Sequence, residues 1–196
     1  MNSSKISIPV FHGSLVGDIK DFRPCSHFGT RKQAVFCAIR KAIENRKKDN
    51  KIYLYACTID AENHEIHHMS SDWDSPKVVA TLYHYLIDSG RADVQKKIWR
   101  EYYHGSNPNP NDAIYFKLLD ENMSEKGHKL LSYNNSHEGE GASYMALYNA
   151  CIAISTVIEI PEKEAREVFS ENQQYYSMIA GRMGNTLEFE DVFSPR

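Results

Sequence analysis

The sequence has no run of about 18 consecutive apolar residues, the length that a membrane-spanning helix requires. Residues 1–10 also lack the long apolar core and the small-residue cleavage site of a secretory signal peptide. We therefore expect no membrane partner. The protein is expected to work in the cytoplasm, or to reach the cytosol of another cell by a route without a cleaved signal.

Cysteine is sparse, and no two cysteines form a Cys-x-x-Cys pair. Neither a disulfide framework nor one of the usual zinc sites is therefore indicated, and the thiols are expected to be free, buried and in a reducing compartment. The His-x-x-His-His stretch, formed by His64, His67 and His68, has no acidic or cysteine partner at a fixed spacing. We interpret it as an exposed turn and expect no metal.

The sequence has no excess of either charge, since 23 basic residues face 26 acidic ones and the net charge is -3. Such a balance gives no general attraction to nucleic acid or anionic lipid. The most basic run, from Arg40 to Lys51, is interrupted by Glu44 and Asp49 and is interpreted as a solvated helix face. A nucleic-acid partner is therefore not favoured.

No linker, internal repeat or low-complexity segment divides the 196 residues, of which 41% are hydrophobic. These values predict a single domain over residues 1–196 with its own core. The apolar spacing predicts an α+β fold. Strands are expected at 7–11, 51–59, 129–133, 143–147 and 151–159, and helices at 31–46, from 75–76 onward, and at 92–103, 112–126 and 161–169.

Several signals mark the ends of these elements. Thr30 and Gln33 form a capping box before the helix that starts at Arg31. Gly127 is expected to end the helix over 112–126. Residues 60–74 are expected to be a polar connection, residues 105–111 a loop without regular structure, and the polar, aromatic segment after Phe169 stays unassigned.

The most informative segment is an acidic turn beside a predicted strand, with the pattern Tyr133-x-Asn135-x-x-Glu138-Gly139-x-Gly141. Because glycine has no Cβ, Gly139 and Gly141 can take positive φ values and approach a ligand closely. Glu138 is therefore a candidate for chemistry. The alternative is a hairpin loop whose glutamate is simply solvated.

Two earlier segments also place polar groups at the ends of predicted elements. The strand over 7–11 ends in His12-Gly13-Ser14, and His27-Phe28-Gly29-Thr30 precedes a helix. The amides at that helix start favour phosphate. Taken alone, a residue such as His12 is more often a structural histidine, and one such as Phe28 is more often core or lid packing.

In this order, the three segments together resemble the mono-ADP-ribosyltransferase fold family, in the His-Tyr-Glu branch of bacterial toxins, effectors and phage proteins. The first resembles "Y-H-G-T/S", the second, with Gln33-Ala34, resembles "H-F-G-T-x-x-x-A", and residues 125–144 resemble an element containing "Y-x-N-x-x-E-G-x-G-x-x-S-Y". The resemblance covers about residues 10–155. It implies a split β-sheet core around an NAD cleft with flanking helices, on which residues 156–196 pack as a C-terminal extension.

The resemblance also implies residue roles in an NAD-dependent glycosyltransferase. His12 would hydrogen-bond the ribose hydroxyls, donating from one nitrogen and accepting at the other. Phe28, where the branch commonly has tyrosine, would stack on nicotinamide, and Glu138 would stabilise the oxocarbenium-like sugar. The implied catalytic residues are Glu138, His12 and Phe28, and the implied NAD-binding residues are His12, Gly13, Ser14, Phe28, Gly29, Thr30, Tyr133 and Asn135.

Two departures from the family pattern matter for the chemistry. Arginine-modifying relatives often carry a second glutamate two positions before the catalytic one, where this chain has Ser136, so arginine is not favoured as acceptor. Glu138 and Glu140 form an E-x-E pair, and we prefer Glu138 because Tyr133, Asn135 and Gly139 then match the pattern. A pyrophosphate-binding cation, Arg31 or Lys32, stays unassigned.

The resemblance implies a mono-ADP-ribosyltransferase that uses NAD as co-substrate, without a metal, for post-translational modification of a protein. It would act as a bacterial effector or toxin, in the cytoplasm or secreted into a host cell cytosol. Targets in the family include actin, GTPases, ubiquitin and metabolic enzymes, and residues 70–111 are the expected target-recognition surface. Two alternatives stay open: a catalytically silent NAD- or protein-binding module, and a transferase acting on nucleic acid or a small molecule.

Overall fold

The computed structural model describes residues 5–45, 51–70, 78–102, 112–135, 138–147, 151–181 and 186–193. Helices and strands form an α+β fold, as predicted, with two β-sheets. The chain divides into two compact units, which are described separately. Unit 1 comprises Met1–Ile6, Arg23–Ser26 and Ala61–Asn149, and unit 2 comprises Ser7–Phe22, His27–Asp60 and Ala150–Arg196. The single-domain assignment stays a prediction.

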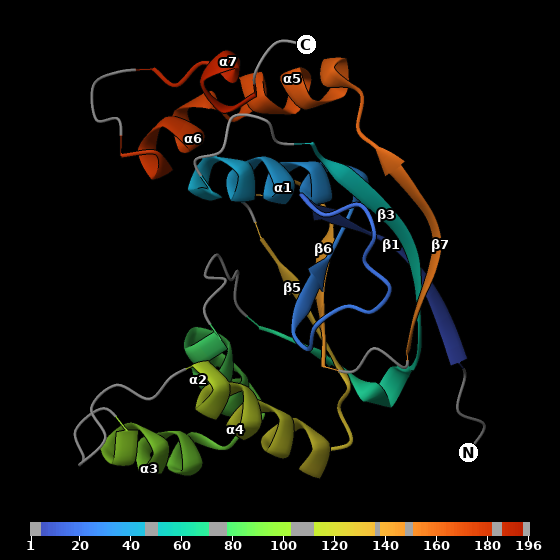
Figure 1. Ribbon diagram of the computed structural model, residues 1–196. Coiled ribbons are helices and arrows are strands. Elements are labelled where there is room, and N and C mark those ends of the chain that lie inside the picture. Colours follow the sequence, from blue (N-terminus) through green and yellow to red (C-terminus); the bar gives the residue numbers. More distant parts are fainter. Residues whose placement is uncertain are drawn as a thin grey trace. The chain divides into compact units, whose positions relative to one another are not determined.

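Unit 2 is built on a three-stranded sheet in the order β1-β3-β7 (Figure 1). Its strands are β1 (Lys5–Ser14), β3 (Tyr53–Glu62) and β7 (Ile152–Glu159). β3 lies in the centre and pairs antiparallel with β7, which explains why the predicted strand over 51–59 is apolar on both faces. β1 extends beyond the predicted 7–11, so His12, Gly13 and Ser14 belong to the strand instead of ending it.

Helix α1 (Arg31–Asn45) begins at the predicted capping box. The Thr30 amide donates to Gln33 Oε1 at 2.7 Å, and the Gln33 amide donates to Thr30 Oγ1 at 3.3 Å. A Cβ on Gly29 would lie 2.3 Å from Gln33 Oε1. The glycine therefore leaves the space in which the Gln33 side chain folds back onto the cap.

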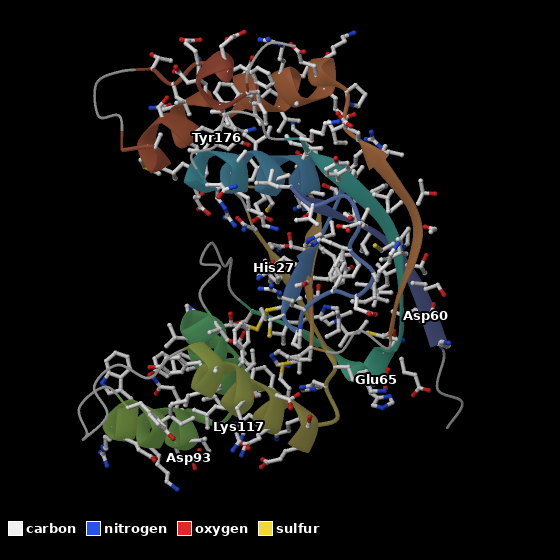
Figure 2. The ribbon with its side chains drawn as sticks, in the orientation of Figure 1. His27, Asp60, Glu65, Asp93, Lys117 and Tyr176 are labelled. Atoms are coloured by element: carbon white, nitrogen blue, oxygen red, sulfur yellow. The ribbon has the colours of Figure 1, made fainter. Side chains whose placement is uncertain are left out.

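The segment after Phe169, which the sequence left unassigned, completes the core of unit 2. Helices α5 (Glu162–Glu171) and α6 (Gln173–Ile179) pack on α1, and α7 (Phe189–Val192) packs on α5 (Figure 1). Tyr176, labelled in Figure 2, is fully buried, and its hydroxyl donates to the Phe36 carbonyl of α1 at 3.2 Å. The predicted helix at 161–169 is confirmed with bounds 162–171.

Unit 1 contains most of a four-stranded sheet in the order β2-β6-β5-β4. Its strands are β2 (Ser26–Phe28), β6 (Ala142–Ala146), β5 (Leu130–Asn134) and β4 (Ile66–His68). β5 pairs antiparallel with β6 and parallel with β4. Helices α2 (Val78–Asp88), α3 (Ala92–Tyr102) and α4 (Asp112–Glu125) complete the unit, with α2 in contact with both α3 and α4.

Two predictions about unit 1 can be compared directly with the structure. Gly127 has φ +74°, and the His128 amide donates to the Met123 carbonyl at 3.0 Å, so the glycine ends α4 as predicted. The expectation of a polar connection over residues 60–74 was wrong for its first half. A 3-10 helix (Asn63–Glu65) and β4 lie there, because His67 pairs with Leu131 of β5 in a parallel ladder. The expected loop at 105–111 and the start of the helix at 75–76 lie outside the described residues.

The four cysteines are free, as expected, but only Cys57 is buried. The others are partly exposed, which corrects the expectation that all four would be buried. No helix in the described ranges combines the length and the apolar character needed to cross a membrane.

Candidate functional site

A single antiparallel bridge brings His12 and Phe28 together in unit 2. The Phe11 amide donates to the Gly29 carbonyl at 2.8 Å, and the Gly29 amide donates to the Phe11 carbonyl at 3.0 Å. Because the two segments run antiparallel, the residue after Phe11 lies opposite the residue before Gly29, with both side chains on one face. The rings of His12 and Phe28 accordingly have centroids 5.4 Å apart.

The protonation of His12 is fixed by its surroundings. Its Nδ1 lies 2.7 Å from the carbonyl oxygen of His27, which is labelled in Figure 2. Because a carbonyl only accepts, Nδ1 carries the proton and Nε2 presents a lone pair. Burial, together with the nearby charge of Lys41, lowers the pKa of His12 to about 4, although the hydrogen bond to the His27 carbonyl opposes the shift. At neutral pH, His12 can therefore accept a hydrogen bond through Nε2 but has no second N–H to donate.

Gly13 and Ser14 are already engaged within unit 2. A Cβ on Gly13 would lie 1.8 Å from the Ala34 carbonyl oxygen, so the glycine permits the close approach of β1 to α1. The Gly13 carbonyl accepts a hydrogen bond from Lys41 Nζ at 3.1 Å. Ser14 Oγ accepts one from the Val16 amide at 3.1 Å. These two residues, which the resemblance implies would bind NAD, thus already have partners from the chain itself.

Sequence reasoning missed Phe22 and Tyr55, which share an aromatic cluster with His12 and Phe28. The Phe22 ring centroid lies 4.9 Å from that of His12, 5.0 Å from that of Phe28 and 5.7 Å from that of Tyr55. Both residues are almost completely buried. The sequence signals were weak, because Phe22 is an isolated aromatic residue in a largely polar stretch and Tyr55 lies within the predicted strand over 51–59.

The two candidates for a pyrophosphate-binding cation, Arg31 and Lys32, form ion pairs with glutamates of α5. Arg31 donates from Nε and Nη2 to the two carboxylate oxygens of Glu164 at 2.7 and 2.8 Å, and Lys32 Nζ lies 2.5 Å from Glu171 Oε2. Lys41 is a cation that acts on both His12 and His27, and Arg40 acts on His27 as well. The charge of Lys41 lowers the pKa of both His12 and His27, although burial is the larger cause in each case.

Glu138 lies in unit 1 on the turn between β5 and β6. Its amide donates to the Asn135 carbonyl at 3.1 Å, and Ser143 Oγ lies 3.5 Å from Glu138 Oε2. Gly139 and Gly141 have φ +109° and +106°, so the predicted positive φ values are confirmed. Glu138 is 9% exposed, whereas Glu140 is exposed. Of the two carboxylates, Glu138 is therefore the buried one. That Glu138 and not Glu140 is the catalytic carboxylate stays a prediction.

The remaining predicted residues have structural contacts. Tyr133 belongs to the apolar core of unit 1 and lies opposite Ser143, and Asn135 is buried. Thr30 caps α1, and both backbone groups of Gly29 bond to Phe11. The structure thus gathers His12, Gly13, Ser14, Phe28, Gly29 and Thr30 in unit 2, and Tyr133, Asn135 and Glu138 in unit 1. Ser136 lies outside the described residues.

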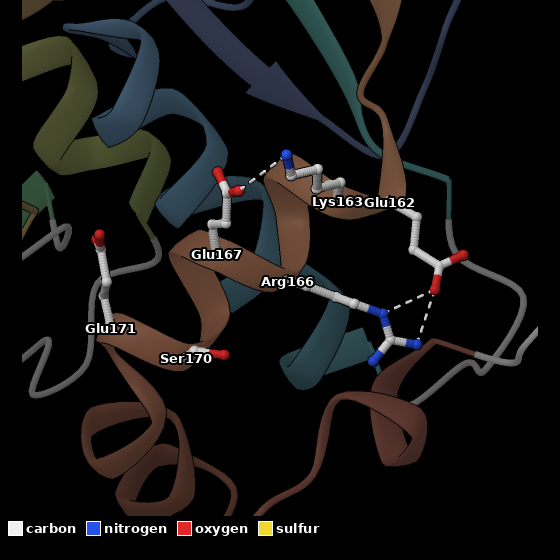
Figure 3. A pocket seen from close by; sticks show the side chains of 6 residues that line it. All are labelled: Glu162, Lys163, Arg166, Glu167, Ser170 and Glu171. Atoms are coloured by element: carbon white, nitrogen blue, oxygen red, sulfur yellow. Dashed lines mark hydrogen bonds and ion pairs between the residues drawn. The ribbon is translucent and has the colours of Figure 1, made fainter.

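A hollow along α5 contains none of these residues (Figure 3). Its central cation, Arg166, bonds Glu162 at 2.7 Å and Glu190 at 2.6 Å, and its guanidinium lies 4.2 Å from the Phe189 ring centroid. Since these contacts already pair the charge, the hollow offers no separate anion site. In the part of the chain that the structure describes, no group of three or more His, Cys, Asp or Glu residues is arranged to hold a metal ion.

Comparisons with known proteins add no relative to this description. No protein-family model, curated protein or solved structure matches the chain. The functional argument therefore depends on the residues described above.

Proposed function

We propose that the chain is a mono-ADP-ribosyltransferase that cleaves NAD and transfers ADP-ribose to a protein side chain. The observation that supports this most directly is the pair of His12 and Phe28 in unit 2, with His12 neutral and Nε2 as an acceptor. A ribose hydroxyl could donate to Nε2, and the face of Phe28 could stack on an aromatic ring.

The proposal assigns the catalytic carboxylate to Glu138. Loss of nicotinamide leaves a positively charged, oxocarbenium-like ribose, and a fixed carboxylate stabilises this state more than the ground state. Glu138 suits the role because it is largely buried and lies beside Ser143 Oγ. A carboxylate held in this way needs little reorganisation when charge develops nearby.

The test is incubation of the protein with labelled NAD and a cell lysate, with nicotinamide release measured in parallel. We expect labelled protein bands and free nicotinamide. Glu138→Gln should lower both by about 10²-fold or more, by comparison with other preorganised electrostatic groups. Glu140→Gln, at the exposed carboxylate, is the matched control and should retain both.

Loss of activity in Glu140→Gln with retention in Glu138→Gln would reverse the assignment of the two carboxylates. If the wild type neither binds NAD nor releases nicotinamide, the proposal is refuted. Labelling of RNA or of a small molecule in the lysate, without protein bands, would instead identify a transferase with a different acceptor.

A second candidate is a catalytically silent NAD- or protein-binding module. The observation in its favour is that the Gly13 carbonyl and the Ser14 hydroxyl are engaged by Lys41 and Val16. The same assay separates the two candidates, because the silent module would bind NAD without releasing nicotinamide.

A further inference from the structure

The segment that follows β1 covers His12 and Phe28 with one aromatic side chain. Most of residues 15–22 are exposed, and Val16 is 51% exposed. Leu15 and Ile19 are half-buried, and Phe22 is the one fully buried residue of the segment, with 4% exposure. Its ring contacts those of His12 and Phe28 at centroid distances of 4.9 and 5.0 Å. A mostly solvated segment thus places a single buried ring over the two residues proposed to contact NAD.

The buried Tyr55 hydroxyl holds this segment at two backbone positions. It donates to the Val16 carbonyl at 2.8 Å and accepts from the Ile19 amide at 2.9 Å. Burial raises the pKa of Tyr55, so the hydroxyl keeps its proton at neutral pH. Ser14 Oγ adds a third bond by accepting from the Val16 amide. The segment is therefore held mainly by side chains of β1 and β3.

We propose that residues 15–22 form a gate over the NAD site, with Phe22 as its plug and the Tyr55 hydroxyl as its latch. This inference rests on the proposed function. In the conformation described, the Phe22 ring packs against the rings of His12 and Phe28. The Val16 amide forms a hydrogen bond with the Ser14 hydroxyl. The gate has to move before a nicotinamide can make these contacts.

The gate and the nicotinamide make the same kinds of contact. Nicotinamide offers an aromatic ring in place of the Phe22 ring, and a carboxamide N–H in place of the Val16 amide that bonds Ser14 Oγ. Opening therefore exchanges the Phe22 and Val16 contacts for equivalent contacts with the ligand, while the two Tyr55 bonds are lost. NAD shifts the gate towards the open state because it makes these contacts only there. The apparent affinity for NAD is reduced by the fraction of molecules whose gate is closed.

Two variants weaken the gate in different ways. Tyr55→Phe removes both latch bonds and keeps the ring of the aromatic cluster. Phe22→Ala removes the plug. Tyr53→Phe is the matched control, since it removes a hydroxyl from the same strand and keeps the ring that lies against Gly17. If Phe22→Ala fails to fold, Tyr55→Phe carries the test.

The experiment measures NAD binding by calorimetry and amide hydrogen exchange on the full chain. We expect Tyr55→Phe and Phe22→Ala to bind NAD about 3- to 10-fold more tightly than the wild type, because more molecules have an open gate. Tyr53→Phe should match the wild type. The Val16 and Ile19 amides should exchange faster in Tyr55→Phe than in the wild type, and NAD should also accelerate their exchange in the wild type.

The outcomes separate the gate from the proposed function. If the wild type binds NAD and releases nicotinamide, but both gate variants bind NAD equally or more weakly and the two amides stay protected, the gate is overturned and the enzyme remains. If neither the wild type nor any variant binds NAD, the proposed function fails and the gate fails with it.

Discussion

At the scale of single residues, burial keeps two adjacent histidines uncharged. Burial is the larger cause and the charge of Lys41 a second one, and together they lower the pKa of His12 to about 4 and that of His27 to about 3. Between pH 6.5 and these values, the unfolded chain binds protons at the two sites and the folded chain does not. Stability therefore falls as the pH falls through this window.

The His12 contribution can be tested by urea unfolding at pH 7 and pH 5. A shift from 6.5 to about 4 makes the wild type lose about 2 kcal/mol of unfolding free energy between these pH values through His12 alone. Between pH 7 and pH 5, the unfolding free energy of His12→Gln should fall by about 2 kcal/mol less than that of the wild type. His84→Gln, at an exposed histidine, controls for removal of a histidine from the surface. An equal loss in His12→Gln and the wild type would contradict the assignment.

The residue-scale features that the sequence could predict depend on local chemistry. Positive φ at Gly139 and Gly141 follows from glycine in an acidic turn. The closeness of His12 and Phe28 instead depends on the bridge between Phe11 and Gly29, which are far apart in the chain. Phe22 could not be predicted, because its place depends on how the whole segment after β1 folds back. The same applies to the Lys41 bond to Gly13, which joins α1 to β1.

At the scale of elements, the start of α1 depends on the Thr30 cap. Thr30→Val keeps the shape of the side chain but removes the oxygen that accepts the Gln33 amide. We expect this to lower the unfolding free energy by about 1 kcal/mol, the usual value of an N-cap. Thr30→Ser keeps the oxygen and is the control. Urea unfolding of the three proteins makes the measurement, and equal losses in both variants would contradict a capping role.

Elements with strong local signals were predicted well. The capping box fixed the start of α1, and Gly127 fixed the end of α4. β4 was missed because a three-residue strand that includes two histidines has no periodicity, and only its pairing with β5 defines it. The short helices α6 and α7 were missed for a similar reason, since their stability comes from packing against the rest of unit 2.

At the scale of the whole molecule, the helices α5, α6 and α7 contribute to the core of unit 2. From the sequence, residues 156–196 were predicted to be a C-terminal extension that lies outside the family resemblance. In the structure, Phe169, Tyr176 and Phe189 share one apolar cluster with Val35 and Ile39 of α1. The cluster depends on contacts between residues far apart in the chain, which local patterns do not reveal.

This core role predicts graded effects at Tyr176. Tyr176→Phe removes only the bond to the Phe36 carbonyl, leaves that carbonyl without this donor, and should lower the unfolding free energy by about 1 kcal/mol. Tyr176→Ala removes a fully buried ring and should cost about 3–5 kcal/mol. Thermal and urea unfolding measure both losses. Equal, small losses in the two variants would show that the tail is dispensable for the core.

The division of unit 2 into three chain segments has a consequence for biosynthesis. α1 leaves the ribosome well before residues 162–193, with residues 61–149 translated in between. At about 5–20 residues per second, the apolar side of α1 stays uncovered for on the order of ten seconds. The nascent chain should therefore bind a general chaperone through Val35, Ile39 and their neighbours until the last helices emerge.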